Sequence, residues 1–234
     1  KKGDIISIDG GTGEVFGGSI NTVEPSLGGD FETLLNWADE VKRLTVRANA
    51  DTPEDAAKAI ELGAKGIGLC RTEHMFMATD RLPVVQQMII AGTPEARKEA
   101  LAKLLPFQYE DFKAIFKTMK NLPVTIRLLD PPLHEFLPNH DDLLAEVVEL
   151  RVKGNNPELL KEKELLLQKV AEQREANPMM GLRGCRLGLT YPEINEMQVR
   201  AIFQAACDLK KEGIDVHPEV MIPLVGHVNE LKIA

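Results

Sequence analysis

From residue 44 to the end of the chain, patterns typical of strands alternate with patterns typical of helices, and this alternation most limits the possible folds. Strands separated by helices usually pair in parallel, so the alternation predicts an α/β fold. It fits either an open doubly wound sheet or a (β/α)₈ TIM barrel, and periodicity alone does not choose between them. Short apolar strands are expected at residues 44–50, 65–71, 123–130, 181–189 and 219–225, with helices that include 157–176 and 192–211.

Two sequence features narrow this choice. No Gly-x-Gly-x-x-Gly follows the first predicted strand, which disfavours a dinucleotide-binding fold. About five strands are expected, whereas a TIM barrel needs about eight. If the chain forms a barrel, residues 44–234 thus cover only part of it. Within it, Thr93 and Pro94 begin a helical segment that Pro106 is expected to interrupt.

The first 43 residues have a different pattern. Residues 4–20 alternate around a glycine-rich turn, which predicts a β-hairpin. A lone hairpin is marginally stable, so residues 1–20 are expected to complete a β-rich domain. Residues 21–43 are interpreted as a linker, with a helix from Phe31 to Arg43 that Asp30 caps. This helix fits almost equally well as the first helix of the next domain.

Charge and composition exclude several classes of protein. The formal net charge of −8 argues against nucleic acid or an anionic membrane as the main partner. No apolar run approaches the ~20 residues that a membrane helix needs. The three cysteines, Cys70, Cys185 and Cys207, are far apart and lack the spacing of a metal site. They are expected to be reduced, which favours a cytoplasmic protein.

Three predicted strands carry an arginine within a polar cluster: Arg71, Arg127 and Arg183. In a parallel barrel such clusters converge on the rim at the carboxyl ends of the strands. Three guanidinium groups there would repel each other unless an anion lay among them, and the arginine fork matches carboxylate and phosphate oxygens. The pattern predicts a site for a small anion with both groups. The alternative is an ion pair of each arginine with Glu73, Asp130 or Glu135.

Two histidines are weaker candidates. His74 and His134 each follow a polar strand end, and either would suit a general base. Neither has a partner that the sequence positions, so a structural role is the more common expectation.

Three motifs resemble the pyruvate, phosphate dikinase family of phosphoenolpyruvate-utilising enzymes. They are Gly-Ile-Gly-Leu-Cys-Arg-Thr-Glu-His-Met-Phe (66–76), Arg-Leu-Leu-Asp-Pro-Pro-Leu-His-Glu-Phe (127–136) and Asn-Pro-Met-Met-Gly-Leu-Arg-Gly-Cys-Arg (177–186). The resemblance implies that residues 1–20 end a swivelling phosphohistidine domain. It implies that residues 44–234 begin the barrel that binds pyruvate or phosphoenolpyruvate. Phosphoenolpyruvate synthases and enzyme I of the sugar phosphotransferase system share the Gly-Leu-x-Arg-Thr-Glu core.

The resemblance also implies a reaction. The full-length family member converts ATP, phosphate and pyruvate to AMP, pyrophosphate and phosphoenolpyruvate through a phosphohistidine. By similarity, Arg71 and Arg127 bind the phosphoryl and carboxylate ends of the substrate, and Arg183 lies near the phosphoryl group. The phosphohistidine is expected before Lys1, and the Mg²⁺ ligands and the proton-donor cysteine beyond Ala234.

The part covered by this sequence is therefore expected to hold no catalytic or metal-binding residue and to be inactive alone. A homodimer is expected by analogy. Two alternatives stay open: an anion-binding module without catalysis, and a phosphoenolpyruvate synthase relative.

Overall fold

The fold was analysed in a computed structural model of the chain. It describes residues 2–22, 28–154, 156–173, 177 and 181–234. The chain divides into two compact units, residues 1–44 and 45–234, and each is described by itself.

The first unit holds the predicted hairpin. Strands β1 (Ile6–Ile8) and β2 (Val15–Gly17) pair antiparallel. The side chain of Asp9 stabilises the turn by accepting a hydrogen bond of 2.8 Å from the Gly11 amide. Helix α1 (Asp30–Val41) follows. The expected cap is wrong, because Gly29 occupies the N-cap position and no side chain caps the helix. That the hairpin belongs to a phosphohistidine domain stays a prediction.

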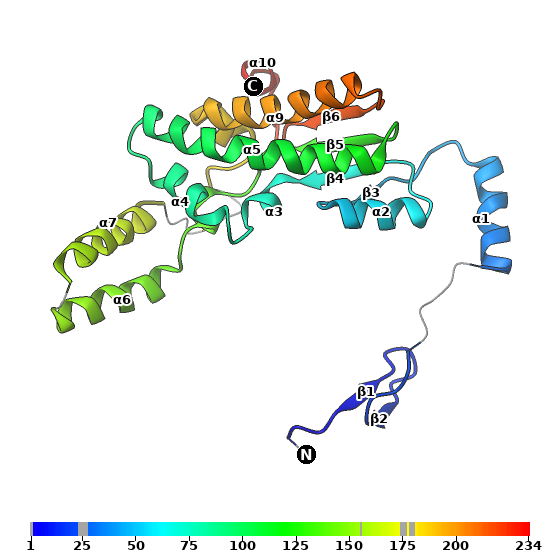
Figure 1. The fold of residues 1–234 in the computed structure, drawn as a ribbon, viewed down its shortest axis with the longest axis horizontal. Coiled ribbons are helices and arrows are strands. Elements are labelled where there is room, and N and C mark those ends of the chain that lie inside the picture. The colour runs from blue at the N-terminus through cyan, green and yellow to red at the C-terminus, as the bar shows by residue number, and fades with distance from the viewer. Residues whose placement is uncertain (1, 23–27, 155, 174–176, 178–180) are drawn as a thin grey trace. The chain divides into compact units, whose positions relative to one another are not determined.

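The second unit is built on a parallel sheet whose strand order follows the chain (Figure 1). A doubly wound sheet reverses its strand order at a switch point, whereas neighbouring strands of a barrel follow one another in sequence. The described residues thus form an α/β unit that matches an arc of a barrel, and they do not close a barrel. The strands are β3 (Ala48–Asn49), β4 (Ile67–Arg71), β5 (Pro123–Arg127) and β6 (His217–Met221).

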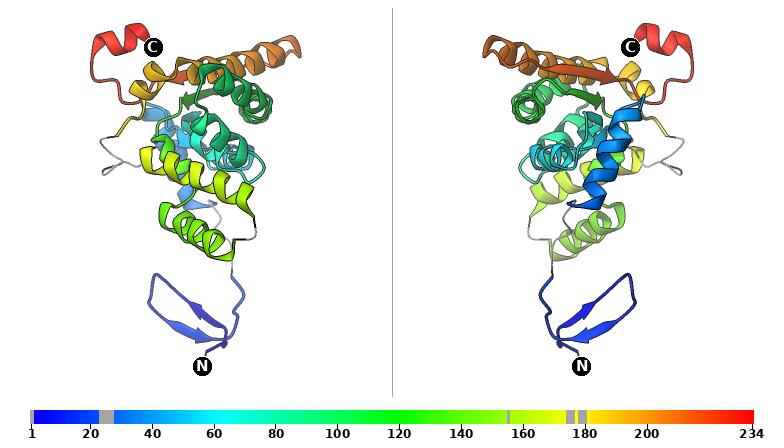
Figure 2. Two further views of the ribbon diagram at one scale, coloured as in Figure 1. Left: turned by 90° about the vertical axis from the view of Figure 1, so that its left-hand side faces the viewer. Right: turned by 90° about the vertical axis from the view of Figure 1, so that its right-hand side faces the viewer.

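Helices α2, α5 and α9 lie along one face of this sheet, as Figure 2 shows. Apolar side chains on that face, such as Val124 and Ile126, are fully buried against Phe112 of α5 and Ala201 of α9. This packing explains why alternate residues of β5 are apolar. The helical segments of the unit are α2 (Pro53–Glu61), α3 (Thr72–Phe76), α4 (Leu82–Ile90), α5 (Pro94–Met119), η1 (Leu133–Phe136), α6 (His140–Lys153), α7 (Pro157–Gln173), α8 (Cys185–Thr190), α9 (Pro192–Lys211) and α10 (Val228–Ile233).

The opposite face of the sheet is polar near its middle. Arg47 donates to both carboxylate oxygens of Glu219, at 2.5 and 3.2 Å, and to the hydroxyl of Thr125 at 3.2 Å. The Arg47 side chain reaches Thr125 and Glu219 across β4 at Gly68. A Cβ at residue 68 would lie 3.2 Å from the Cβ of Arg47. These hydrogen bonds thus link the residue that precedes β3 to the strands β5 and β6.

Three predictions about elements are wrong. Residues 181–189 form no strand, and the segment instead runs into helix α8. The described part of the chain therefore has four parallel strands where five were expected. Pro106 does not interrupt α5, which continues from Pro94 to Met119 because buried side chains on both sides of the proline hold it in place. Helix α6 was not expected, and it lies beside α7 (Figure 1).

Candidate functional site

Strands β4 and β5 end side by side, and each ends in an arginine. Arg71 and Arg127 are partners in the register of β4 with β5, and Arg127 in turn pairs with Met221 of β6. The predicted convergence of these arginines at the carboxyl end of the sheet is therefore observed. It follows from two short apolar runs that stop at the same level of a parallel sheet.

Arg71 is held by Asp51, which lies two residues after the end of strand β3. One oxygen of Asp51 accepts a bond of 2.6 Å from the backbone amide of Arg71. Its other oxygen lies 3.1 Å from both Nε and Nη2 of the guanidinium. The same oxygen lies 2.7 Å from Nδ1 of His74. The expected partner of Arg71, Glu73, is thus replaced by Asp51.

Arg127 lies between two buried carboxylates. Its Nη2 pairs with Glu73, and its Nη1 lies 3.1 Å from Asp130. The backbone next to it is also fixed, because the hydroxyl of the buried Thr72 donates to the Arg127 carbonyl at 3.1 Å. These contacts orient the guanidinium at the end of β5.

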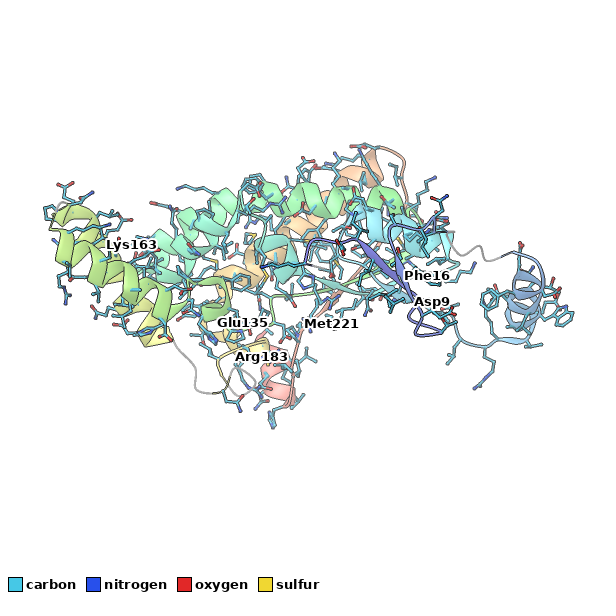
Figure 3. The ribbon with its side chains drawn as sticks, turned by 90° about the horizontal axis from the view of Figure 1, so that it is seen from below. Asp9, Phe16, Glu135, Lys163, Arg183 and Met221 are labelled. Carbon is cyan, nitrogen blue, oxygen red and sulfur yellow. The ribbon has the colours of Figure 1, made fainter. Side chains whose placement is uncertain are left out.

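Arg183 reaches the same place from a loop instead of from a strand end. The amide of Gly184 donates to the carbonyl of Asp130 at 2.9 Å, and the amide of Cys185 donates to that of Pro223 at 2.9 Å. Gly184 has φ +59°, and a Cβ there would lie 3.0 Å from Leu224, so the turn needs glycine. The loop thus lies across the ends of β5 and β6, and Figure 3 labels Arg183 of this loop and Met221 at the end of β6.

Asp130 connects the second and third arginines. Its Oδ2 lies 3.1 Å from Arg127 and 2.8 Å from Nη2 of Arg183. The three arginines are therefore brought together, each beside a carboxylate: Asp51, Glu73 or Asp130. The argument that their repulsion requires an anion is consequently wrong, since these carboxylates balance the charge. The predicted ion pairs of Arg127 and Arg183 are present, whereas Glu135 is exposed and contributes to none of these pairs.

Some hydrogen-bonding atoms in this cluster are buried without a partner among the described residues. They are Oε2 of Glu73, Oδ1 of Asp130 and Nε of Arg127. Buried polar atoms normally find a partner, which is often water or a ligand. The cluster therefore has hydrogen-bonding capacity that the described side chains do not use.

The two candidate histidines differ in their surroundings. His74 bonds to Asp51 beside Arg71 and is half exposed, at 49%. His134 lies in η1 and lines a cavity of about 320 Å³ together with Asn139 and His140. The described contacts of the three arginines do not include His134. Only His74 is thus joined to the arginine cluster.

Cys70 precedes Arg71 but points toward the buried face of the sheet. Its side chain is fully buried, and burial raises the pKa of the Cys70 thiol to about 12, with a further contribution from the negative charge of Asp51. The thiol is therefore protonated at neutral pH and unsuited to nucleophilic chemistry.

The described residues do not form a metal site. Among them, no group of three or more His, Cys, Asp and Glu side chains is arranged to hold a metal ion. Two carboxylates near Arg127 are already paired with guanidinium groups. The residues present therefore do not fit Mg²⁺ by themselves.

The described part of the chain also contains no helix that is long and apolar enough to cross a membrane.

Comparison with known protein families shows to which family the chain belongs. A model of the PEP-binding domain of PEP-utilising enzymes matches residues 26–234. The chain belongs to this family of PEP-utilising enzymes.

Three curated relatives of this chain are named pyruvate, phosphate dikinase. The pyruvate, phosphate dikinase of Entamoeba histolytica is 54% identical over 98% of the chain and 26% of its own length. That of Giardia intestinalis is 51% identical over 100% of the chain and 26% of its own length. That of Clostridium symbiosum is 52% identical over 99% of the chain and 26% of its own length. The chain thus spans about a quarter of the length of these relatives.

Sequence reasoning missed Asp51, although a signal for it was present. Asp51 directly follows the first predicted strand, 44–50, in the way that Arg71 follows the second. The rule that strand ends form the site would have included it.

Proposed function

We propose that this chain supplies the pyruvate- and phosphoenolpyruvate-binding part of a pyruvate, phosphate dikinase. The observation that carries the proposal is the cluster of Arg71, Arg127 and Arg183, which the sheet ends and one crossing loop bring together. The identity of 51–54% to dikinases along almost the whole chain supports it.

The chemistry of the substrate explains the use of arginine. Phosphoenolpyruvate carries a phosphate and a carboxylate on one small carbon skeleton, and both groups accept paired hydrogen bonds from a guanidinium fork. Arginines that carboxylates already orient lose little further side-chain entropy when the substrate binds. We assign Arg71 and Arg127 to the two ends of the substrate, and Arg183 to the phosphoryl group.

The proposed reaction transfers a phosphoryl group from a phosphohistidine to pyruvate. Pyruvate gives a methyl proton to a group outside these residues that acts as the acid in the reverse direction, the enolate oxygen bonds to phosphorus, and the bond from phosphorus to the histidine nitrogen breaks. Negative charge on the enolate and on the phosphoryl oxygens is stabilised by fixed cationic donors. The three arginines can supply this stabilisation, whereas the histidine, the acid and Mg²⁺ are proposed to come from parts of the protein outside these residues.

The remaining features of the full-length protein are also proposals. They are ATP and phosphate as further substrates, a homodimer, and a cytoplasmic location. Plant relatives such as that of Flaveria pringlei are named chloroplastic, so the location does not follow from the family.

The test is an Arg127 variant of the full-length dikinase that carries this sequence. Arg127→Lys keeps the positive charge beside Glu73 and Asp130 but removes the fork. We expect the rate of phosphoenolpyruvate formation to fall about 10²- to 10³-fold, as for the loss of one fixed donor to a developing negative charge. ATP-dependent phosphorylation of the histidine should keep its rate, because it uses a different site.

Rapid-quench assays of the two half-reactions make this measurement. Arg127→Ala should abolish phosphoenolpyruvate turnover, but it also leaves Glu73 and Asp130 buried without that partner, so its thermal unfolding must be compared with wild type. Loss of both half-reactions in a folded Arg127→Lys protein would contradict the assignment. A protein that binds phosphoenolpyruvate and performs neither half-reaction would instead support the anion-binding module.

A further inference from the structure

The contacts of Asp51 indicate a role for this residue that the positions of the three arginines alone do not reveal. Asp51 uses one carboxylate oxygen for the backbone amide of Arg71, at 2.6 Å, and the other for Nε and Nη2 of the same residue, both at 3.1 Å. A single carboxylate therefore fixes the main chain and the side chain of Arg71 together. Its own side chain is only 10% exposed, so solvent does not compete strongly for these bonds.

This arrangement determines which donors of Arg71 stay available. Asp51 occupies the Nε and Nη2 edge of the guanidinium. No described residue bonds to Nη1 of Arg71, and the Arg71 side chain is 36% exposed. The edge formed by Nη1 and Nη2 is thus the one that can donate to a substrate oxyanion. Arginine binds oxyanions best when one such edge faces them in a plane.

His74 is the second group on Asp51. Its Nδ1 lies 2.7 Å from the Asp51 oxygen that binds the guanidinium. Because a carboxylate oxygen accepts, Nδ1 is the ring nitrogen that bears hydrogen, and it donates a hydrogen bond to Asp51. His74 comes from α3, which starts directly after Arg71. Asp51 therefore lies between Arg71 and His74, and it cannot turn away from Arg71 without breaking the bond to His74.

We propose that Asp51 is a positioning residue that sets the orientation of Arg71 for binding the anionic substrate, with His74 holding Asp51 in place. This inference rests on the proposed function, because it needs Arg71 to bind pyruvate or phosphoenolpyruvate. Asp51 itself does not contact the substrate, and it affects substrate binding only through the orientation of Arg71.

The test is a double-variant comparison in the full-length dikinase. Asp51→Asn keeps the size of the side chain but removes the charge and one strong acceptor. The kcat/KM for phosphoenolpyruvate should fall about 10- to 100-fold, because misplacing a binding group by about 1 Å has effects of this size. In an Arg71→Met background the same change should have almost no further effect, since Asp51 then has no arginine to orient.

Two controls separate positioning from folding. Asp55→Asn removes a carboxylate from the first turn of the neighbouring helix α2, where the Asp55 side chain is exposed and makes no contact with Arg71, and should leave kcat/KM unchanged. ATP-dependent phosphorylation of the histidine should keep its rate in every variant. If Asp51→Asn does not fold, Asp51→Glu, which keeps the charge and displaces it by one methylene, replaces it in the same comparison and should show the same loss only when Arg71 is present.

The outcomes distinguish this inference from the proposed function. Equal fold-losses for Asp51→Asn with and without Arg71 would overturn the positioning role, as would an Asp51→Asn enzyme with wild-type kcat/KM. If Arg71→Met itself left phosphoenolpyruvate turnover unchanged, the proposed function would fail first.

Discussion

Asp130 shows how single residues organise this site. Its side chain is 6% exposed and pairs with both Arg127 and Arg183, while its carbonyl accepts a hydrogen bond from the amide of Gly184. A buried carboxylate between two guanidinium groups is stabilised by both, and the guanidinium groups are in turn fixed in direction. Asp51 has the same relation to Arg71. Orientation of cationic donors by buried acids is therefore the common principle of the cluster.

Burial also predicts the reactivity of the cysteines. Because burial raises the pKa of the Cys70 thiol to about 12, its thiolate is almost absent at pH 8, whereas Cys207 is exposed. We expect iodoacetamide to modify Cys207 in the folded full-length protein at pH 8 and to leave Cys70 at least tenfold less modified. Peptide mass mapping measures the ratio.

Unfolding provides the control for this labelling. In strong denaturant both thiols should react at similar rates, because burial no longer separates them. Equal labelling of Cys70 and Cys207 in the folded protein would show that β4 is not packed as described.

At the level of single residues, the sequence predicts where charged groups gather but not every ion pair that they form. Arg71 and Arg127 were located correctly because an apolar run that ends in a polar cluster marks a strand end. The partner of Arg71 was not predicted, because pairing depends on which strand ends are neighbours, and Asp51 is 20 residues from Arg71 in the sequence. Arg183 was placed at a strand end, but it reaches the cluster through a loop.

Among the elements, the sheet strands are linked by side chains on their open face. Arg47 lowers the pKa of Glu219 through its hydrogen bonds. A carboxylate whose pKa is lowered by folding stabilises the folded state above its unfolded pKa, 4.5 here, and this stabilisation is lost as the pH falls through the folded pKa. Since both side chains are partly exposed, the contribution is small, about 0.5 kcal/mol.

Glu219→Gln tests this link in the full-length protein. At pH 7 we expect amide hydrogen exchange in β5 and β6 to become about two- to threefold faster than in wild type, because the ion pair is lost. The difference should shrink as the pH falls below about 4. Hydrogen exchange with mass spectrometry measures both values.

The matched control for this experiment is the Arg47→Met background, where Glu219→Gln should change nothing further. A difference between Glu219→Gln and wild type that is the same at pH 7 and at low pH would contradict the electrostatic account.

Element types were predictable where periodicity and caps agreed. Thr52 and Thr93 cap α2 and α5, each accepting a bond from a backbone amide three residues on. The segment 181–189 was misassigned because a short apolar run fits a strand and a buried helix equally well. Helix α6 was missed because its apolar positions give only a weak periodic signal among many charged residues.

At the scale of the whole molecule, the parallel order β3-β4-β5-β6 is what brings the arginines together. Chain order gives neighbouring strands whose carboxyl ends face the same way, so residues 56 positions apart become partners, as Arg71 and Arg127 are. Alternation of strands and helices predicted this α/β arrangement, but the number of strands was overestimated by one because of segment 181–189.

The account of function rests on Arg71, Arg127 and Arg183 acting as the binding site of an anionic substrate. The most direct measurement is the dissociation constant of phosphoenolpyruvate, by calorimetry, for the full-length protein and its Arg71→Met variant. The control is Arg200→Met, which removes an equal charge from an exposed pair with Glu196 on α9. We predict that Arg71→Met weakens binding about 10- to 100-fold, as expected for hydrogen bonds to a charged group, and that Arg200→Met does not weaken it. Equal binding by wild type and Arg71→Met would contradict the account.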